Sequence, residues 1–248
     1  MDLKMIFNIF RIVSIRKTIW VNFRLFPLKE FILFHIIVGR NVRILNLKNI
    51  EVFDLYKGRI HLGTSPLFNV STKEEIVINN NGKLKIGGNV IVQPGCILFT
   101  DKKGTIELKG NNRIGARTQI LSKRSIVIEE NTGISWDCQI CDSDFHFIEN
   151  LESHKILSNT KSITIGKNVW IGNHVIVGKG VTIGDNNIIG QNSYVNKSMD
   201  DKNRIIVGSP ARYLNGKYAR IWDLKMEQSL QDKCDQYDTQ YSNNANEK

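Results

Sequence analysis

The chain has 248 residues, of which 41% are hydrophobic and 23% charged, and its formal net charge is +10. This composition is typical of a globular protein, and four cysteines are too few for a disulfide framework in a chain of this length. The sequence does not open with the charged, apolar and small-residue regions of a signal peptide, so we expect a protein of the reducing cytoplasm.

Residues 1–59 form the first predicted unit, a basic and apolar segment. Its first 43 residues hold eight basic and two acidic side chains among the apolar stretches "MIFNIFRIV", "TIWVNFRLF" and "EFILFHIIVG". These stretches are too often interrupted for a membrane-spanning helix. Two interpretations stay open: the segment caps the main domain, or it makes peripheral contact with an anionic membrane surface. Nucleic acid is not expected as a partner, because no nucleic-acid motif accompanies the basic residues.

Residues 60–213 are predicted to form a solenoid. From Ile165 the sequence reads as six hexapeptides, "IGKNVW", "IGNHVI", "VGKGVT", "IGDNNI", "IGQNSY" and "VNKSMD", each led by Ile or Val. A period of six fits neither a helix nor a simple strand, so each unit is a short strand followed by a turn. Three units close one triangular coil, and the coils stack. The same pattern continues upstream with slips of register.

Residues 214–248 are predicted to hold a C-terminal α-helix and a disordered tail. The stretch "YARIWDLKMEQSLQ" has helical periodicity. The residues expected to share one helix face are Tyr218, Ile221, Trp222 and Lys225. Residues 231–248 contain no Leu, Ile, Val or Phe, which predicts disorder.

A loop at residues 145–162, "FHFIENLESHKILSNTKS", interrupts the hexapeptides. Counting in sixes from Ile140 arrives at His146, where an inward aliphatic side chain is due. A histidine is poor core material, and a neutral imidazole can accept a proton near neutral pH, so His146 is the candidate general base.

The carboxylates before this histidine are further candidates. Asp144 is predicted to orient the imidazole, and Asp142 to bind sugar hydroxyls, although solvated turn carboxylates are the alternative for both. His154 in the loop and Trp136 before it are assigned to acceptor binding.

The cysteines of "CQICDSDFHF" suggest a metal site at first sight. The hexapeptide register instead places Cys138, like Cys96, in a small inward position, and Cys141 at a corner. A single C-x-x-C without a second pair is weak evidence for zinc. We therefore expect no metal.

The stretches "ITIGKNVWIGNHVIVGKGVTIGDNNIIGQNSYVNK" and "RIIVGSPAR" resemble the left-handed β-helix, or hexapeptide-repeat, acetyltransferases. The likeness is to bacterial sugar O-acetyltransferases of the maltose and galactoside type and to those that modify capsule and lipopolysaccharide. The resemblance implies an all-β left-handed parallel β-helix, homotrimers, acetyl-CoA as donor and active sites between subunits. It also implies donor-binding roles for Trp170, Asn173, Gln191, Asn196, Lys197 and Arg212.

The resemblance therefore predicts an acetyl-CoA-dependent O-acetyltransferase that acts on a saccharide of a surface polysaccharide or its precursor. Three alternatives stay open. The same base could serve N-acetylation of an amino sugar, the fold is shared with zinc hydratases of the carbonic anhydrase type, and the solenoid could be an inert scaffold. The histidine spacing does not favour the zinc hydratase.

Overall fold

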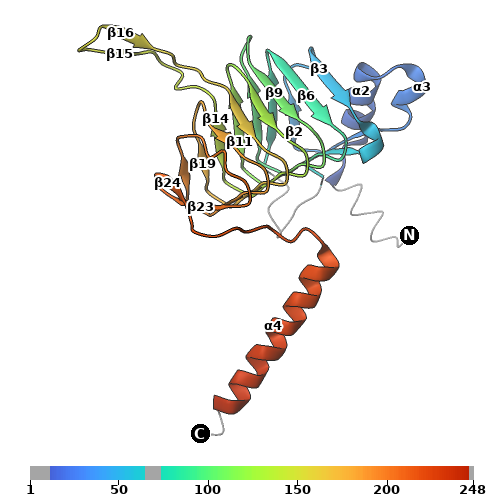
Figure 1. Cartoon of the computed structure of the whole chain (residues 1–248). Helices are drawn as coiled ribbons and strands as arrows, with labels where there is room; N and C mark the ends of the chain where they lie inside the picture. The colour runs from blue at the N-terminus through green and yellow to red at the C-terminus, as the bar shows by residue number, and fades with distance from the viewer. Residues whose placement is uncertain (1–11, 65–73, 246–248) are drawn as a thin grey trace. The chain divides into compact units, whose positions relative to one another are not determined.

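The structure, a computed structural model, describes residues 12–64 and 74–245, with side chains described to residue 235. Three parallel sheets form the faces of a triangular prism, and each turn of the chain adds one strand to each face (Figure 1). The fold is the predicted left-handed parallel β-helix. A domain boundary at residue 60 was wrong, because strands from Ile36 onward already pair in parallel with later coils.

The strands of each face follow one another along the prism. The first face contains β1 (Ile36–Val38), β4 (Ile60–Leu62), β7 (Ile91–Val92), β10 (Arg113–Ile114), β13 (Gly133–Ile134), β18 (Trp170–Ile171), β21 (Ile188–Ile189), β23 (Ile205–Gly208) and the antiparallel β24 (Ala211–Tyr213). The second contains β2 (Val42–Ile44), β5 (Ile76–Asn80), β8 (Ile97–Thr100), β11 (Gln119–Ser122), β14 (Gln139–Cys141), β19 (Ile176–Val177) and β22 (Tyr194–Val195). The third contains β3 (Ile50–Phe53), β6 (Lys83–Gly87), β9 (Thr105–Leu108), β12 (Ile126–Ile128), β17 (Ile163–Ile165) and β20 (Thr182–Ile183).

The turns between faces stack into three edges. The first edge joins the first face to the second, through residues 39–41, 63–64, 74–75, 93–96, 115–118, 135–138, 172–175 and 190–193. The second edge joins the second face to the third, through residues 45–49, 81–82, 101–104, 123–125, 142, 161–162, 178–181 and 196–198. The third edge returns to the first face, through residues 54–59, 88–90, 109–112, 129–132, 166–169, 184–187 and 200–204.

The core consists of the inward side chains of the repeats. The leading residues of the six hexapeptides are all buried, as the register predicts: Ile165, Ile171, Val177, Ile183, Ile189 and Val195. Each stacks on its equivalent in the neighbouring coil through strand pairing, for example Ile134 with Ile171. Burial of such aliphatic side chains stabilises the solenoid by contacts between neighbouring coils.

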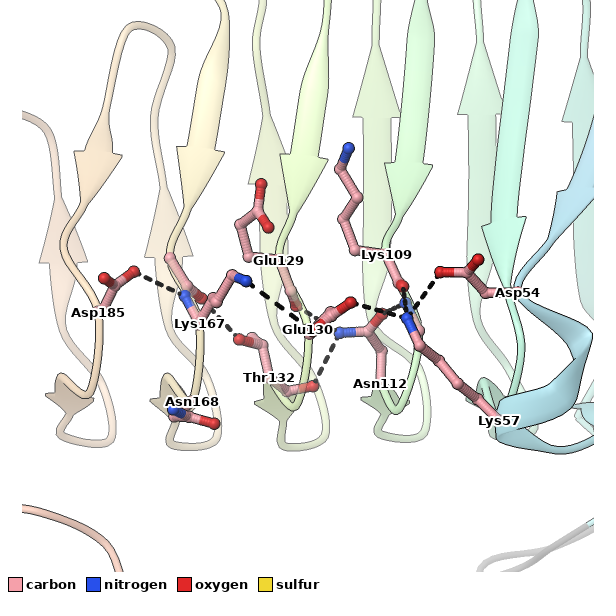
Figure 2. A network of polar contacts seen from close by, with 12 residues as sticks. Asp54, Lys57, Lys109, Asn112, Glu129, Glu130, Thr132, Lys167, Asn168 and Asp185 are labelled. Atoms are coloured by element: carbon pink, nitrogen blue, oxygen red, sulfur yellow. Dashed lines mark hydrogen bonds and ion pairs between the residues drawn. The ribbon is translucent and has the colours of Figure 1, made fainter.

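The third edge is held by an ion-pair network, shown in Figure 2. The Lys57 ammonium donates to Asp54 Oδ2 at 2.8 Å and to Glu130 Oε1 at 2.7 Å. Lys57 comes from the 3₁₀ helix η1 (Leu55–Lys57), so this cation ties the first coil to a later one. Asparagine suits the left-handed turns of this edge, and the Asn89 amide donates to Asn111 Oδ1 at 2.8 Å.

Helix α2 (Ile15–Leu25) covers the exposed edge of the first strand, and the short α3 (Leu28–Phe31) follows it. The Asn22 side chain donates to Ile36 O at 2.7 Å and accepts from Ile36 N at 3.1 Å, while Thr18 Oγ1 accepts from Val38 N at 3.0 Å. These polar side chains satisfy backbone groups that an edge strand would leave unpaired.

The C-terminal segment forms a separate unit from Ala219 onward. Its helix α4 (Leu224–Ala245) starts later and ends later than predicted. The predicted shared face of Tyr218, Ile221 and Trp222 was wrong, because these residues precede the helix, and so was the disordered tail from residue 231. The tail's polar composition does not prevent helix formation, since its Gln and Asp side chains pair four residues apart, as Gln228 does with Asp232.

Among the described helices, none has the length and apolar character needed to span a bilayer.

Candidate active site

The predicted interruption is an arm that leaves the second edge. The arm, residues 143–160, contains the antiparallel strands β15 (Ile148–Asn150) and β16 (Lys155–Leu157) and projects away from the stacked coils (Figure 1). Its side chains include exposed large apolar residues: Phe145, Phe147, Ile148, Leu151, Ile156 and Leu157. An exposed apolar surface of this size on a polar arm indicates that another surface covers it.

Asp142 lies directly before the arm, and its predicted contact with substrate was wrong. The side chain is buried, with 0% exposed. Its carboxylate accepts from Ser122 Oγ at 2.8 Å, from Lys123 N at 2.7 Å and from Arg124 N at 2.9 Å. A carboxylate so occupied fixes the turn of the preceding coil and does not face solvent.

The burial of Asp142 could have been predicted from the position that it occupies in the repeat. Asn80, Thr100 and Ser122 occupy the corresponding position in the preceding coils, and each is polar and buried. Neighbouring members bond in pairs: Thr100 Oγ1 donates to Asn80 Oδ1 at 2.6 Å, and Ser122 Oγ donates to Asp142 Oδ2. A polar inward position repeated over several coils predicts a satisfied internal network rather than a ligand.

Asp144 does not contact the His146 ring in the structure. Its carboxylate pairs with the Lys179 ammonium, which also donates to Ser158 O at 2.7 Å. The Asp144 N–H donates to Asn159 O at 2.9 Å. The ammonium is the stronger partner for a carboxylate, and it joins both strands of the arm's base. Lys179 was missed from the sequence, although it stands on the second edge one coil after Asp142.

His146 is presented by a tight turn at the arm's base. The His146 N–H donates to Asp144 O at 2.7 Å, and Phe145 between them has φ of 60°. A left-handed conformation is uncommon for a bulky aromatic residue and persists only where the surroundings fix it. Ser143 Oγ accepts from Phe145 N at 2.9 Å and contributes to that fixing. The His146 side chain is exposed, so its ring is accessible to an acceptor.

His154 lies at the far end of the arm. It occupies the turn between β15 and β16, and its Nδ1 is 3.3 Å from Glu149 Oε1. The side chain is exposed. Its predicted contact with the acceptor stays a prediction.

Three predicted site residues gather at the first edge instead. Trp136, Asn173 and Gln191 stand at the same corner position in successive coils, since Ile134, Ile171 and Ile189 pair in register. Backbone bonds link the three turns, with His174 N donating to Trp136 O at 3.2 Å and Asn192 N to Asn173 O at 3.0 Å.

Trp170 lies beside this group on the first face. Its Nε1 is 3.4 Å from Ser135 Oγ, and both Trp170 and Trp136 are more than a third exposed. Exposed indoles beside small corner residues offer an apolar surface with a polar rim.

The remaining predicted donor contacts lie elsewhere on the last coils. Asn196 and Lys197 are exposed on the second edge. Arg212 is exposed on β24, where it pairs with Val207. Within one chain the predicted residues therefore fall on two edges, separated by the second face, and the structure of one chain does not bring them together.

Cys96 and Cys138 are buried core residues, as the repeat register predicts. Cys138 Sγ donates to Gly172 O at 3.1 Å and Cys96 Sγ to Gly115 O at 3.0 Å. Burial raises the pKa of Cys138 to about 11 and that of Cys96 to about 12, so both remain protonated thiols. Within the ranges that the structure describes, no three His, Cys, Asp or Glu side chains gather as a metal site.

The sequence matches one protein-family model and one relative in particular. A model of the bacterial transferase hexapeptide family, with six repeats, matches residues 162–197. The chain is 36% identical over 196 residues to the "24.8 kDa protein in cps region" of Klebsiella pneumoniae, across 79% of this chain and 86% of that protein.

Two solved structures resemble this chain. The polysialic acid O-acetyltransferase OatWY has a TM-score of 0.54 and 22% identity, across 74% of this chain and 88% of that chain, which shows a shared fold. The N-acyltransferase AntD of Bacillus cereus has a TM-score of 0.45 and 19% identity, across 85% and 98% of the two chains.

Proposed function

Because the chain belongs to the bacterial hexapeptide-repeat transferases, we propose that it transfers an acetyl group from acetyl-CoA to a hydroxyl of a surface-polysaccharide sugar or its precursor. The observation that carries the proposal is the arm base, where a turn tied by Asp142, Asp144 and Lys179 presents His146 to solvent. The cps region named for the Klebsiella relative agrees with a polysaccharide acceptor.

In the proposed reaction His146 acts as general base. The imidazole takes the proton of the acceptor hydroxyl while the hydroxyl oxygen attacks the thioester carbonyl carbon. The carbon–sulfur bond then breaks, and the CoA thiolate leaves and takes up a proton from the imidazolium. The acetyl group passes directly to the acceptor, without an acyl-enzyme. Asp144 acts on this step through the arm's geometry, since its carboxylate is held by Lys179.

The site is completed by a second copy of the chain. The arm and Lys197 stand at the second edge, whereas Trp136, Asn173 and Gln191 stand at the first edge. In a closed homotrimer, the arm and the last coils of one protomer's second edge meet the last coils of its neighbour's first edge, and the middle coils of the second edge stay open. The exposed apolar side chains of the arm supply a surface for that contact. Trp170 and Asn173 would then hold the pantetheine arm, and Lys197 and Arg212 the phosphates.

The N-terminal helices support contact with an anionic membrane surface. Ile15, Ile19 and Phe23 recur every four residues on α2 and are exposed, and Trp20 lies beside them. The basic Arg16, next to this stripe, is also exposed. An exposed apolar stripe flanked by cations suits the plane of an anionic bilayer at the cytoplasmic face.

Vesicle cosedimentation tests the membrane contact. Phosphatidylglycerol vesicles should retain the protein and phosphatidylcholine vesicles should not, while Phe23→Glu should release it. Equal retention of both proteins by both vesicles would contradict the contact.

The activity is tested by incubating the purified protein with acetyl-CoA and a panel of saccharides. We expect thiol release that depends on the saccharide, together with a product heavier by one acetyl group. Release of that group by mild alkali would identify an ester, whereas resistance would identify an amide. No saccharide-dependent thiol release across neutral, amino and acidic sugars would contradict the proposed function.

A further inference from the structure

The second edge differs in charge from the other two. Outside the arm it holds eight basic and two acidic side chains. The described part of the first edge holds two basic and three acidic ones, and the third edge holds six of each. We call five of these eight basic residues, which lie on three successive coils, the basic ridge: Lys102, Lys103, Lys123, Arg124 and Lys161.

The two acidic residues of this edge leave most of the ridge without a counterion. The Asp142 carboxylate is buried and occupied by its three hydrogen bonds. Asp101 Oδ2 is 3.5 Å from the Lys123 ammonium. Lys102, Lys103 and Arg124 are exposed, and none of them forms an ion pair with a described carboxylate. Like charges held side by side repel one another, so an anionic ligand would relieve the arrangement.

The ridge is continuous because the turns of successive coils are hydrogen-bonded. Asp101 N donates to Ser122 O at 2.8 Å, and Gly180 N donates to Lys161 O at 3.1 Å. Neighbouring strands lie about 4.8 Å apart, so the cations recur in short regular steps along the prism. A linear ligand with repeated negative charges matches this spacing.

The ridge leads to the arm. The Lys123 ammonium lies 5.3 Å from the centroid of the Phe145 ring, next to His146. Toward the N-terminal coils, a hollow of about 420 Å³ adjoins the ridge. Its walls include Lys102, Lys103, Asn49 and Thr105, together with Lys83, whose charge is paired with Glu51 at 2.9 Å. Cations, an amide and a hydroxyl in one hollow suit a sugar ring that carries an acidic group.

We propose that the basic ridge binds an anionic polysaccharide, whose carboxylate or phosphate groups pair with its cations while one hydroxyl reaches His146. This inference rests on the proposed function and adds the chemical class of the acceptor. No aromatic side chain occurs among the edge residues 81–82, 101–104 and 123–125 to stack a nucleic-acid base, and no apolar one to enter a bilayer.

The test compares binding of two soluble polymers of equal length to the full chain. Polygalacturonate should bind with an affinity that falls as salt increases, and dextran should not bind. The triple variant Lys102→Glu, Lys103→Glu and Arg124→Glu should bind polygalacturonate at least about tenfold more weakly. The matched control, Arg113→Glu, Lys225→Glu and Lys233→Glu, changes the net charge equally away from the ridge and should bind as the wild type does.

Three results would overturn the inference: equal binding of dextran and polygalacturonate, equal loss in both triple variants, or tighter binding of single-stranded DNA than of polygalacturonate. Acetyl transfer separates this inference from the proposed function. In the ridge variant kcat/KM should fall more for the polymer than for a galacturonate disaccharide. A protein that binds the polymer at the ridge but acetylates no saccharide would contradict only the proposed function.

Discussion

Replacing Asp142 by Asn tests whether this carboxylate holds the arm's base from within. In the structure Oδ2 accepts from Ser122 Oγ and Arg124 N, and Oδ1 accepts from Lys123 N. An amide has one acceptor oxygen. Ser122 can turn its hydroxyl toward Thr105 O, 3.0 Å away, but one of the two backbone N–H groups loses its partner in either orientation of the amide.

A buried N–H without a partner costs about 1–3 kcal/mol. For a domain of this size each kcal/mol lowers Tm by roughly 2–4 °C, so Asp142→Asn should lower it by about 2–12 °C. Asp142→Ala leaves both backbone N–H groups unpaired and should cost about 2–6 kcal/mol. The control Asp144→Asn removes an accessible ion pair and should cost less than about 1 kcal/mol.

Thermal unfolding and hydrogen exchange measure the two consequences. The amides of Lys123 and Arg124 should exchange faster in Asp142→Asn than in the wild type. If Asp142→Asn instead melts and exchanges as the wild type does, and its only effect is a higher KM for the acceptor, the carboxylate contacts substrate and the reasoning from burial fails.

Three further predictions concern Lys179, Lys57 and the thiols. Lys179→Met releases both strands of the arm's base, so limited proteolysis within residues 145–157 should accelerate with little change in Tm; unchanged cleavage would contradict the clamp. Lys57→Met removes the cation that lowers the pKa of Glu130, so it should lower the free energy of unfolding by about 1 kcal/mol at pH 7. This loss of stability should shrink as the pH falls below 4.5 and Glu130 gains a proton. A loss that does not change with pH would contradict the ion pairing. At pH 8 a thiol reagent should label the exposed Cys234 in the folded protein. It should label Cys138 only on unfolding, because burial raises the pKa of Cys138 to about 11. Rapid labelling of Cys138 in the folded protein would contradict its burial.

The sequence predicts the later coils because their hexapeptides are regular. Every leading Ile or Val from Ile165 to Val195 is buried, and Cys138 lies in the core as its register position indicates. The first coil could not be found in this way. Its strands from Ile36 onward are separated by turns of unequal length, and the cap formed by α2 depends on the polar contacts of Asn22, which no periodicity reveals.

The candidate site was predicted only in part. The interruption of the repeat correctly located the arm, but a sequence does not distinguish an exposed turn carboxylate from one enclosed by backbone donors, as Asp142 is. Asp144 was paired with the nearest imidazole in the sequence, whereas its ammonium partner, Lys179, comes from the next coil. Contacts between coils depend on which residues pair across the arm, and the length of the arm does not allow that pairing to be counted from the sequence.

The turnover of His146→Ala tests the central claim most directly. The purified variant should keep its oligomeric state and its affinity for CoA, because the ring is exposed and forms no hydrogen bond or ion pair within the described part of the chain. Loss of a general base should lower kcat for acetyl transfer by about 10²–10⁴-fold. Turnover within about twofold of the wild type would show that another group accepts the proton and would contradict the account.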